Sequence, residues 1–126
     1  MARNNEEDKK TLLKIEDMMG YAYHAFNQFP KSVRFTIVSD MRSCMDTMLE
    51  RAVEADEMYF KKTTLRDLDI ANAKLKHYLL ICDREHYFSH HTFEVWNDYL
   101  TEIGRLVGAR RTIVEEWEGK KKASKG

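Results

Sequence analysis

Apolar residues recur every three or four positions over most of this chain, which is the spacing of an amphipathic α-helix. The clearest row lies in residues 89–117, where one charged residue interrupts an otherwise apolar seam. The seam consists of Phe93, Trp96, Leu100, Ile103, Val107, Arg110, Val114 and Trp117. The pattern therefore predicts a long helix that buries one face against other helices.

Three earlier segments show the same helical periodicity. The first apolar row runs from Leu12 to Phe29, and Pro30 disfavours helical geometry at the residue before it. The second row is rich in methionine and alanine, and the third carries leucines on one face. We therefore expect helices over residues 8–29, 31–57, 64–86 and 89–117.

Short signals in the sequence predict where these helices begin and end. Pro30 suits the first turn of the second helix, and Thr64 with Asp67 resembles a capping box at the start of the third. Ser89 is the expected N-cap of the fourth helix. Gly119 is expected to end that helix, because glycine is common just past helix C-termini.

Four amphipathic helices with short connections favour an all-α fold, specifically an antiparallel up-down-up-down four-helix bundle. The composition agrees, because 43% of residues are hydrophobic and 33% are charged, with 5 Gly and 1 Pro. The longest connection is expected at residues 58–63. The length suits one domain over residues 1–126, with a frayed start over 1–7 and a solvated basic tail over 119–126.

The formal net charge is zero, but the two halves of the chain differ. Residues 1–60 hold 8 basic and 11 acidic side chains, whereas residues 61–126 hold 13 basic and 10 acidic side chains. An anionic partner would therefore dock on the second half. The candidate phosphate-contacting residues there are Lys74, Lys76, Arg105, Arg110, Arg111, Lys120, Lys121 and Lys122. A solvated face, or an ionic contact between subunits, would explain the same residues.

Arg110 differs from the other basic residues because it occupies the apolar seam of the last helix. A charge at such a position is costly unless it is paired or reaches water. Arg110 lies close to the predicted end of the bundle. We expect its side chain to extend along the helix and place the guanidinium in water.

The aromatic residues outnumber the places that a small core offers. Six tyrosines and two tryptophans cannot all point into four helices of this length without crowding. They are Tyr21, Tyr23, Tyr59, Tyr78, Tyr87, Tyr99, Trp96 and Trp117. Apolar surface left over in this way is typical of contacts between subunits, so the sequence predicts a homo-oligomer.

The cysteines and the N-terminus bear on the compartment. Cys44 and Cys82 both occupy apolar helical positions, which favours free buried thiols in a reducing compartment. The N-terminus is polar and charged, unlike a signal peptide. No apolar run approaches the roughly 20 residues that span a bilayer. We expect a cytoplasmic protein that does not act in a membrane.

The sequence offers little for catalysis. Cys82, His86, His90 and His91 could supply one tetrahedral metal site, or they could be a buried thiol beside a polar turn. Bundles that bind two iron ions use Glu-x-x-His pairs, and the sequence has none. It also has no glycine-rich phosphate loop and no nucleophile at a fixed spacing from a base. We expect a protein that is not an enzyme and that has no metal or cofactor.

Two stretches carry a resemblance to a known family: LRDLDIANAKLKHYLLI at residues 65–81 and FEVWNDYLTEIGRLVG at residues 93–108. The second contains Glu102-Ile103-Gly104-Arg105-x-x-Gly108, and residues 29–55 match more loosely. In these stretches the chain resembles the four-helix-bundle family of the accessory variability determinant (Avd) proteins of diversity-generating retroelements. That family also includes small bundle proteins encoded within intervening sequences of bacterial 23S ribosomal RNA.

The resemblance implies an accessory role instead of catalysis. Proteins of the Avd branch form pentameric, barrel-like assemblies and bind the retroelement reverse transcriptase together with RNA or DNA. They support mutagenic retrohoming, in which template RNA is copied with errors at adenines and the cDNA replaces part of a variable gene. The basic residues of the second half are then candidates for binding the reverse transcriptase or nucleic acid.

The chain also departs from the family pattern. Family members commonly carry two basic positions on the third helix, and here Lys76 matches the first while Leu80 replaces the second. Many are strongly basic, whereas this chain is neutral, and Ala109-Arg110 stands where a Gly-Trp pair is common. These departures fit an alternative role, a structural or interaction bundle of the intervening-sequence type with no part in a retroelement.

Overall fold

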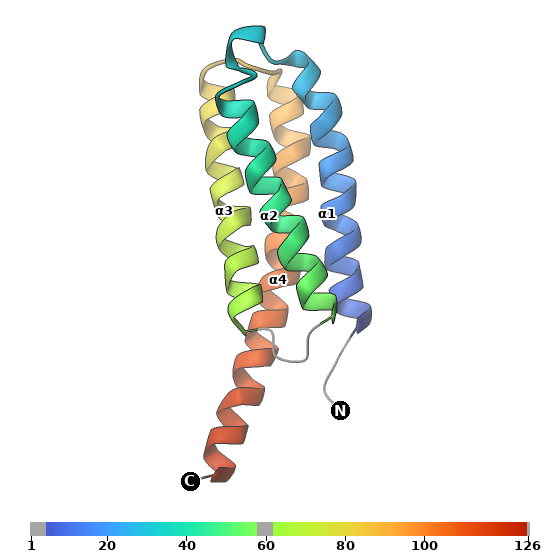
Figure 1. Ribbon diagram of the computed structural model, residues 1–126, viewed down its shortest axis with the longest axis vertical. Coiled ribbons are helices and arrows are strands. Elements are labelled where there is room, and N and C mark those ends of the chain that lie inside the picture. The colour runs from blue at the N-terminus through green and yellow to red at the C-terminus, as the bar shows by residue number, and fades with distance from the viewer. Residues whose placement is uncertain (1–4, 58–61, 126) are drawn as a thin grey trace.

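A computed structural model describes residues 5–57 and 62–125 of the chain. The described residues form four α-helices and contain no strand: α1 (Asn5–Ala25), α2 (Ile37–Glu57), α3 (Lys62–Arg84) and α4 (His90–Lys125). Successive helices run in opposite directions, as Figure 1 shows. Each packs against its neighbour in sequence, and α1 closes the arrangement by packing against α4. The predicted antiparallel up-down-up-down bundle is confirmed.

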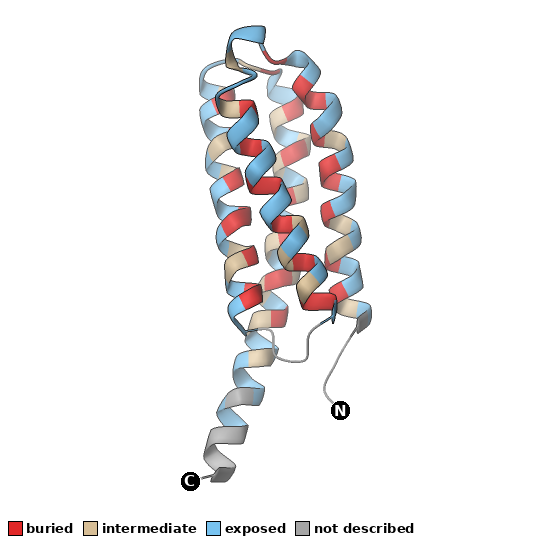
Figure 2. Ribbon diagram, viewed as in Figure 1, coloured by how far each residue is buried: buried red, intermediate tan, exposed pale blue. Residues whose placement is uncertain are grey.

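The predicted apolar rows form the core. Figure 2 shows that buried positions recur along all four helices. Trp96, Leu100, Ile103 and Val107 of the α4 seam are completely inaccessible to solvent. The rest of the core includes Ile15, Met19 and Ala22 of α1, with Phe26 and Phe29 just after it; Val38, Met41, Met45, Met48 and Ala52 of α2; and Leu68, Leu75, Leu79 and Cys82 of α3. The 3–4 spacing therefore identified the core face of each helix.

The connection between α1 and α2 differs from the prediction. The first helix ends at Ala25 and continues as a 3₁₀ turn over Phe26–Gln28, and a second 3₁₀ turn covers Lys31–Val33. The second α-helix begins at Ile37, not at residue 31. Pro30 is extended, with ψ 146°, and the turn that follows it closes through a hydrogen bond from the Val33 amide to the Pro30 carbonyl. Two tight turns reverse the chain here, where the second helix was expected to follow Pro30 directly.

The starts and ends of the last two helices also need correction. Thr64 lies inside α3, which begins at Lys62, so it does not cap the helix. The predicted connection at residues 58–63 lies mostly outside the described residues. Gly119 does not end α4, because a helix interior tolerates glycine at a cost of about 1 kcal/mol and lysines that favour helix follow it. The last part of α4 extends past the other three helices (Figure 1).

The turn between α3 and α4 is held by side-chain hydrogen bonds. The Thr92 amide donates to the Ser89 hydroxyl at 3.1 Å, which confirms Ser89 as the N-cap of α4. The Gln28 side chain donates to the Thr92 hydroxyl at 2.8 Å and accepts from the Ser89 amide at 3.0 Å. These bonds join the 3₁₀ turn that follows α1 to the start of α4. His86 adopts the left-handed conformation, with φ 59°, where the chain leaves α3.

None of the helices in the described residues has the length and apolar character needed to cross a bilayer.

Candidate partner-binding surface

The predicted lysines of α3 lie on its surface. Lys74 is exposed, and its ammonium lies 5.9 Å from the centre of the Tyr78 ring. Lys76 is half-buried and donates a hydrogen bond to the Thr101 hydroxyl of α4 at 3.0 Å. Neither ammonium forms an ion pair with a described carboxylate, so both retain a charge that a phosphate or carboxylate of a partner could meet.

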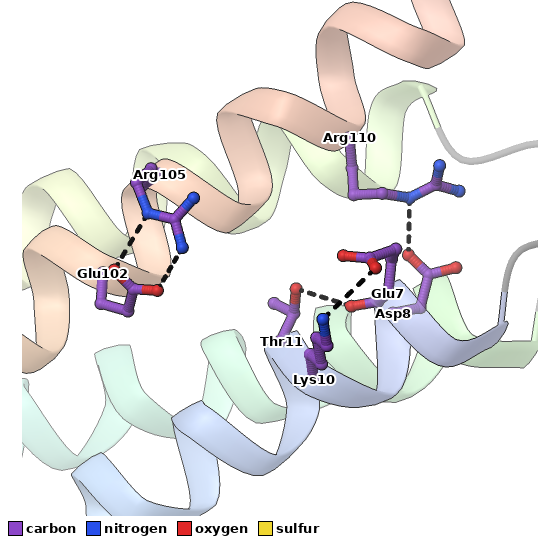
Figure 3. Close-up of polar contacts among 7 residues, drawn as sticks. All are labelled: Glu7, Asp8, Lys10, Thr11, Glu102, Arg105 and Arg110. Atoms are coloured by element: carbon purple, nitrogen blue, oxygen red, sulfur yellow. Dashed lines mark hydrogen bonds and ion pairs between the residues drawn. The ribbon is translucent and has the colours of Figure 1, made fainter.

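Arg105 is exposed but already paired. Its Nε donates to Glu102 Oε2 at 3.0 Å, one turn back on α4, as Figure 3 shows. The hydrogen bond from Arg105 lowers the pKa of Glu102, and the same bond raises the pKa of Arg105. Because the pair lies at the surface, a partner phosphate could replace the Glu102 carboxylate at small cost.

The expectation that Arg110 reaches water is wrong. Its side chain is 7% exposed, and its Nε donates to Asp8 Oδ1 of α1 at 3.2 Å (Figure 3). The Asp8 side chain is 2% exposed. A seam position points into the bundle, and the first turn of α1 supplies a carboxylate at that level. Arg110 therefore joins α1 to α4 internally and does not form part of an accessible surface.

Arg111 also holds two helices together. Its Nη1 lies 2.7 Å from Asp69 Oδ2 of α3, and its Nη2 lies 4.0 Å from Glu115 Oε1 of α4. The side chain is one-third exposed. A partner anion would compete with two carboxylates at this position, so Arg111 is a weaker candidate than the lysines.

The predicted basic residues at the chain end lie on helix. Lys120 is exposed on the part of α4 that extends past the bundle. The backbone of α4 continues through Lys121 and Lys122, whose side chains lie outside the described part of the chain. The predicted residues thus spread over α3, the middle of α4 and its extension, and do not meet at a single point.

The aromatic residues pack inward more fully than expected. Trp96 is completely buried and lies edge-on to Phe26, with ring centres 5.5 Å apart. Four of the six tyrosines, Tyr21, Tyr78, Tyr87 and Tyr99, are partly buried against the core. Tyr59 lies outside the described residues. Tyr23 and Trp117 are 44% and 36% exposed, so little of the expected aromatic surface remains for a subunit contact.

Aliphatic side chains of α3 supply exposed apolar surface that the predicted core row does not include. Ile70 and Ile81 are 60% and 40% exposed, and their spacing places them on one face of α3 together with Lys74 and His77. Leu80, 46% exposed, lies beside them. We call these five residues the α3 outer face. Ile70 and Lys74 also line a groove of 460 Å³ between α2 and α3. Ile70, Lys74, His77 and Ile81 repeat at helical spacing beside the core row of α3. This second row could have predicted the face from the sequence.

The cysteines are free and buried, as predicted. The Cys44 thiol donates to the Ala71 carbonyl at 3.1 Å, and the Cys82 sulfur lies 3.7 Å from the Met41 sulfur. Burial raises the pKa of Cys82 to about 12, so the reactive thiolate is scarce at neutral pH. His86, His90 and His91 are exposed at the turn. Within the described residues, no three His, Cys, Asp or Glu side chains gather as metal ligands would.

The glycines of the last helix have different surroundings. A Cβ on Gly104 would lie 3.2 Å from the Asn72 side-chain nitrogen, which donates to the Leu100 carbonyl at 2.9 Å. A Cβ on Gly108 would meet nothing within 4 Å. Gly104 therefore permits the close approach of α3 to α4, and Asn72 uses this space to bind the backbone of α4.

A comparison with known families identifies the family to which this bundle belongs. A sequence model of a family described as bAvd-like matches residues 10–114, which include parts of all four helices. No curated protein and no solved structure matches the chain. Because the family match covers most of the chain, and the fold is a four-helix bundle, the chain belongs to the bAvd-like family, a family of accessory proteins and not a known enzyme family.

Proposed function

We propose that the protein is a non-enzymatic accessory subunit of a diversity-generating retroelement. In this role it binds the reverse transcriptase and RNA or DNA in the cytoplasm and supports mutagenic retrohoming. The observation that carries the proposal is the bAvd-like match over residues 10–114. The reverse transcriptase performs the chemistry, and the bundle supplies a surface that holds enzyme and nucleic acid together.

The α3 outer face and the neighbouring lysine support this proposal. The α3 outer face combines exposed aliphatic side chains at Ile70 and Ile81 with the ammonium of Lys74. The neighbouring lysine, Lys76, lies on the same helix. Apolar anchors surrounded by charge are typical of protein interfaces, and lysine ammonium groups contact phosphates with little dependence on sequence. We infer that binding to nucleic acid is sensitive to salt and weakly sequence-specific.

We also propose that the protein acts as a homo-oligomer, a pentamer as the Avd resemblance implies. Residues 61–126 carry 13 basic and 10 acidic side chains. Five copies would then carry about fifteen net positive charges in this half of the chain, and repeated weak contacts add through effective concentration.

A binding experiment tests the role. The full-length protein and the reverse transcriptase encoded beside its gene are mixed and captured together at about 50 mM salt, where phosphate contacts are strongest. Binding of labelled single-stranded RNA is followed by fluorescence anisotropy. Retention of the reverse transcriptase supports the proposal, and a clean failure to retain it counts against the accessory role.

Variants of the lysines sharpen this test. Lys74→Gln with Lys76→Gln is expected to weaken RNA binding and to reduce the salt slope by about 0.7 for each phosphate that the variant no longer neutralises. The matched control is Lys10→Gln on α1, whose ammonium is exposed and pairs with Glu7. Arg110 and Arg111 are unsuitable for this purpose, because substituting either one breaks an ion pair between helices.

A second candidate function is a structural or interaction bundle of the ribosomal intervening-sequence type. The observation that favours it is the neutral net charge, since Arg105, Arg110 and Arg111 already form ion pairs with carboxylates of the same chain. This alternative predicts no RNA binding above background at about 50 mM salt. A gene that lies within a ribosomal RNA gene, with no reverse transcriptase beside it, would favour the second function.

A further inference from the structure

A surface pocket lies at the end of the bundle where α1 turns into α2, and none of the predicted binding residues lines it. Its volume is 390 Å³, and its walls include Tyr23, Phe26, Arg34, Phe35 and Arg42. Figure 1 shows the α1–α2 connection at the opposite end of the molecule from the extension of α4. We call this site the end pocket.

Phe35 is the most unusual residue of the end pocket. Its side chain is 94% exposed, more than any other large apolar side chain in the described part of the chain. It lies in the turn that precedes α2 and has no ring contact with another described aromatic residue. Tyr23, on the last turns of α1, adds a second aromatic ring that is 44% exposed. The fold thus leaves these aromatic rings exposed to solvent, although burying them would stabilise the protein.

Two guanidinium groups accompany these rings. Arg42 lies 5.4 Å from the centre of the Tyr23 ring and 5.2 Å from that of Phe26, so the aromatic rings hold its position. Arg34 adjoins Phe35 in sequence and is exposed. Neither arginine forms an ion pair with a described carboxylate, in contrast to the arginines of α4, and no carboxylate lines the pocket.

The local sequence reinforces this charge. Residues 18–39 contain no aspartate or glutamate, although the first half of the chain is acidic overall. The stretch does contain Lys31 and Arg34. The two acidic residues that flank this stretch, Asp17 and Asp40, are not among the residues that line the pocket. The end pocket is therefore a positively charged site with exposed aromatic rings, suited to an anion that carries a flat ring.

We propose that the end pocket binds one unpaired nucleotide of a single-stranded nucleic acid, with the base stacked on Phe35 and the phosphate held by Arg34 and Arg42. Exposed aromatic rings beside arginines are the means by which proteins bind single strands without reading their sequence. A base must leave a duplex to stack in this way, so the ligand is a single strand.

A peptide fits the same observations less well. A helical peptide in a groove inserts several apolar anchors spaced three or four residues apart. The end pocket presents one fully exposed apolar ring with arginines close to it, which matches the ring and phosphate of a nucleotide. The inference deepens the proposed function by adding a site for nucleic acid. It rests on one part of that function, the binding of a nucleic-acid strand by the intact protein.

Two labelled oligonucleotides of about 12 nucleotides test the inference, one of thymidines and one of abasic residues with the same number of phosphates. Their binding to the full-length protein is measured by fluorescence anisotropy at about 50 mM salt. Phe35→Ala is expected to weaken binding of the thymidine strand about tenfold and to leave binding of the abasic strand unchanged. Arg34→Gln is expected to weaken binding of both strands, because it removes a phosphate contact.

Matched controls separate the site from general effects. Leu13→Ala removes an apolar side chain that is 58% exposed on α1, and Arg66→Gln removes an exposed arginine of α3 that contacts Asp67. Both are expected to bind the two strands as the unmodified protein does. Circular dichroism is expected to be unchanged for Phe35→Ala, because a side chain that is 94% exposed contributes little to the core.

The outcomes distinguish this site from the proposed function. If the unmodified protein binds the thymidine strand and Phe35→Ala binds it equally well, the end pocket is not the site, while the accessory role stands. If the unmodified protein binds neither strand, the inference is overturned whether or not the reverse transcriptase is retained. Binding of thymidine monophosphate with the affinity of the strand, or Phe35-dependent binding of an acidic peptide alone, would also overturn it.

Discussion

At the scale of single residues, charges decide which parts of this chain are available to partners. Arg105 and Arg110 are both candidate phosphate-contacting residues in the sequence, yet the structure pairs Arg105 at the surface and Arg110 in the interior. Arg34 and Arg42 belong to no motif of the sequence, and they form no ion pair with a described carboxylate. The availability of a cation therefore depends on the carboxylates that the fold brings beside it.

Arg110 provides a stability prediction. Arg110→Met removes the buried guanidinium that neutralises Asp8, and we expect the free energy of unfolding to fall by about 3 kcal/mol. Urea denaturation should show a lower midpoint with an unchanged slope. The double variant Asp8→Leu with Arg110→Met should recover most of the loss, because a buried ion pair can be replaced by apolar side chains at little cost. A full loss in the double variant would contradict this account.

His90 gives a pH prediction. Its Nδ1 lies 3.0 Å from Asp83 Oδ1, and this hydrogen bond raises the pKa of His90 above its ordinary value near 6.5. The pKa of His90 is higher in the folded protein than in the unfolded chain. The stabilisation from the Asp83 contact is therefore fully present below the unfolded-state pKa and is lost as pH rises through the folded-state pKa. NMR titration of the imidazole should show a midpoint above that of a model peptide.

The matching stability measurement uses two variants. The His90–Asp83 contact contributes a part of the free energy of unfolding that declines as pH rises just above 6.5, and His90→Gln should remove that part. His91→Gln changes an exposed histidine of the same turn and should retain that part. Equal pH profiles for the two variants would show that the Asp83 contact does not form in solution.

At the scale of helices, α4 carries the largest difference between expectation and structure. Its predicted apolar seam is fully buried at Trp96, Leu100, Ile103 and Val107, whereas Trp117 is 36% exposed. The end of the helix was not predicted, because glycine both terminates helices and is tolerated inside them. The Glu102-Ile103-Gly104-Arg105-x-x-Gly108 run has a physical explanation in the structure. Gly104 permits Asn72 to bind the backbone of α4, and Glu102 and Arg105 form an exposed pair on the outer side.

The two glycines of this run predict different effects on stability. Gly108→Ala should raise the free energy of unfolding by up to about 1 kcal/mol, because alanine favours helix and its Cβ meets no neighbour. Gly104→Ala places a Cβ 3.2 Å from the Asn72 nitrogen and disturbs its hydrogen bond, worth about 1 kcal/mol. Thermal or urea denaturation should therefore rank Gly104→Ala below Gly108→Ala. The reverse order would mean that Asn72 moves without cost.

At the scale of the whole molecule, the bundle leaves two surfaces that its own core does not use, the α3 outer face and the end pocket. They lie on different parts of the molecule, one along a helix and one at the end where α1 meets α2. An accessory subunit that joins a protein to a nucleic acid needs separate surfaces of this kind. The domain assignment over residues 1–126 stays a prediction.

Assembly can be tested on the α3 outer face. Ile70→Glu with Ile81→Glu places two charges on side chains that are 60% and 40% exposed, so the monomer should keep its helicity. If this face joins subunits, the assembly should weaken more than tenfold, because each apolar side chain buried is worth about 1.5–3 kcal/mol. Sedimentation velocity measures the change. Leu13→Glu on α1 is the control, and dissociation by that variant alone would place the contact on α1 instead.

The sequence by itself determined the helical class, the inward face of each helix, the N-cap at Ser89 and the family resemblance. These features depend on spacing and on neighbouring residues, so they can be read along the chain. The tertiary structure decided that Arg110 faces Asp8, that Phe35 stays exposed beside two arginines, and that Asn72 meets Gly104. Each of these depends on residues far apart in sequence, or on the shape of a turn, and helical periodicity carries no information about either.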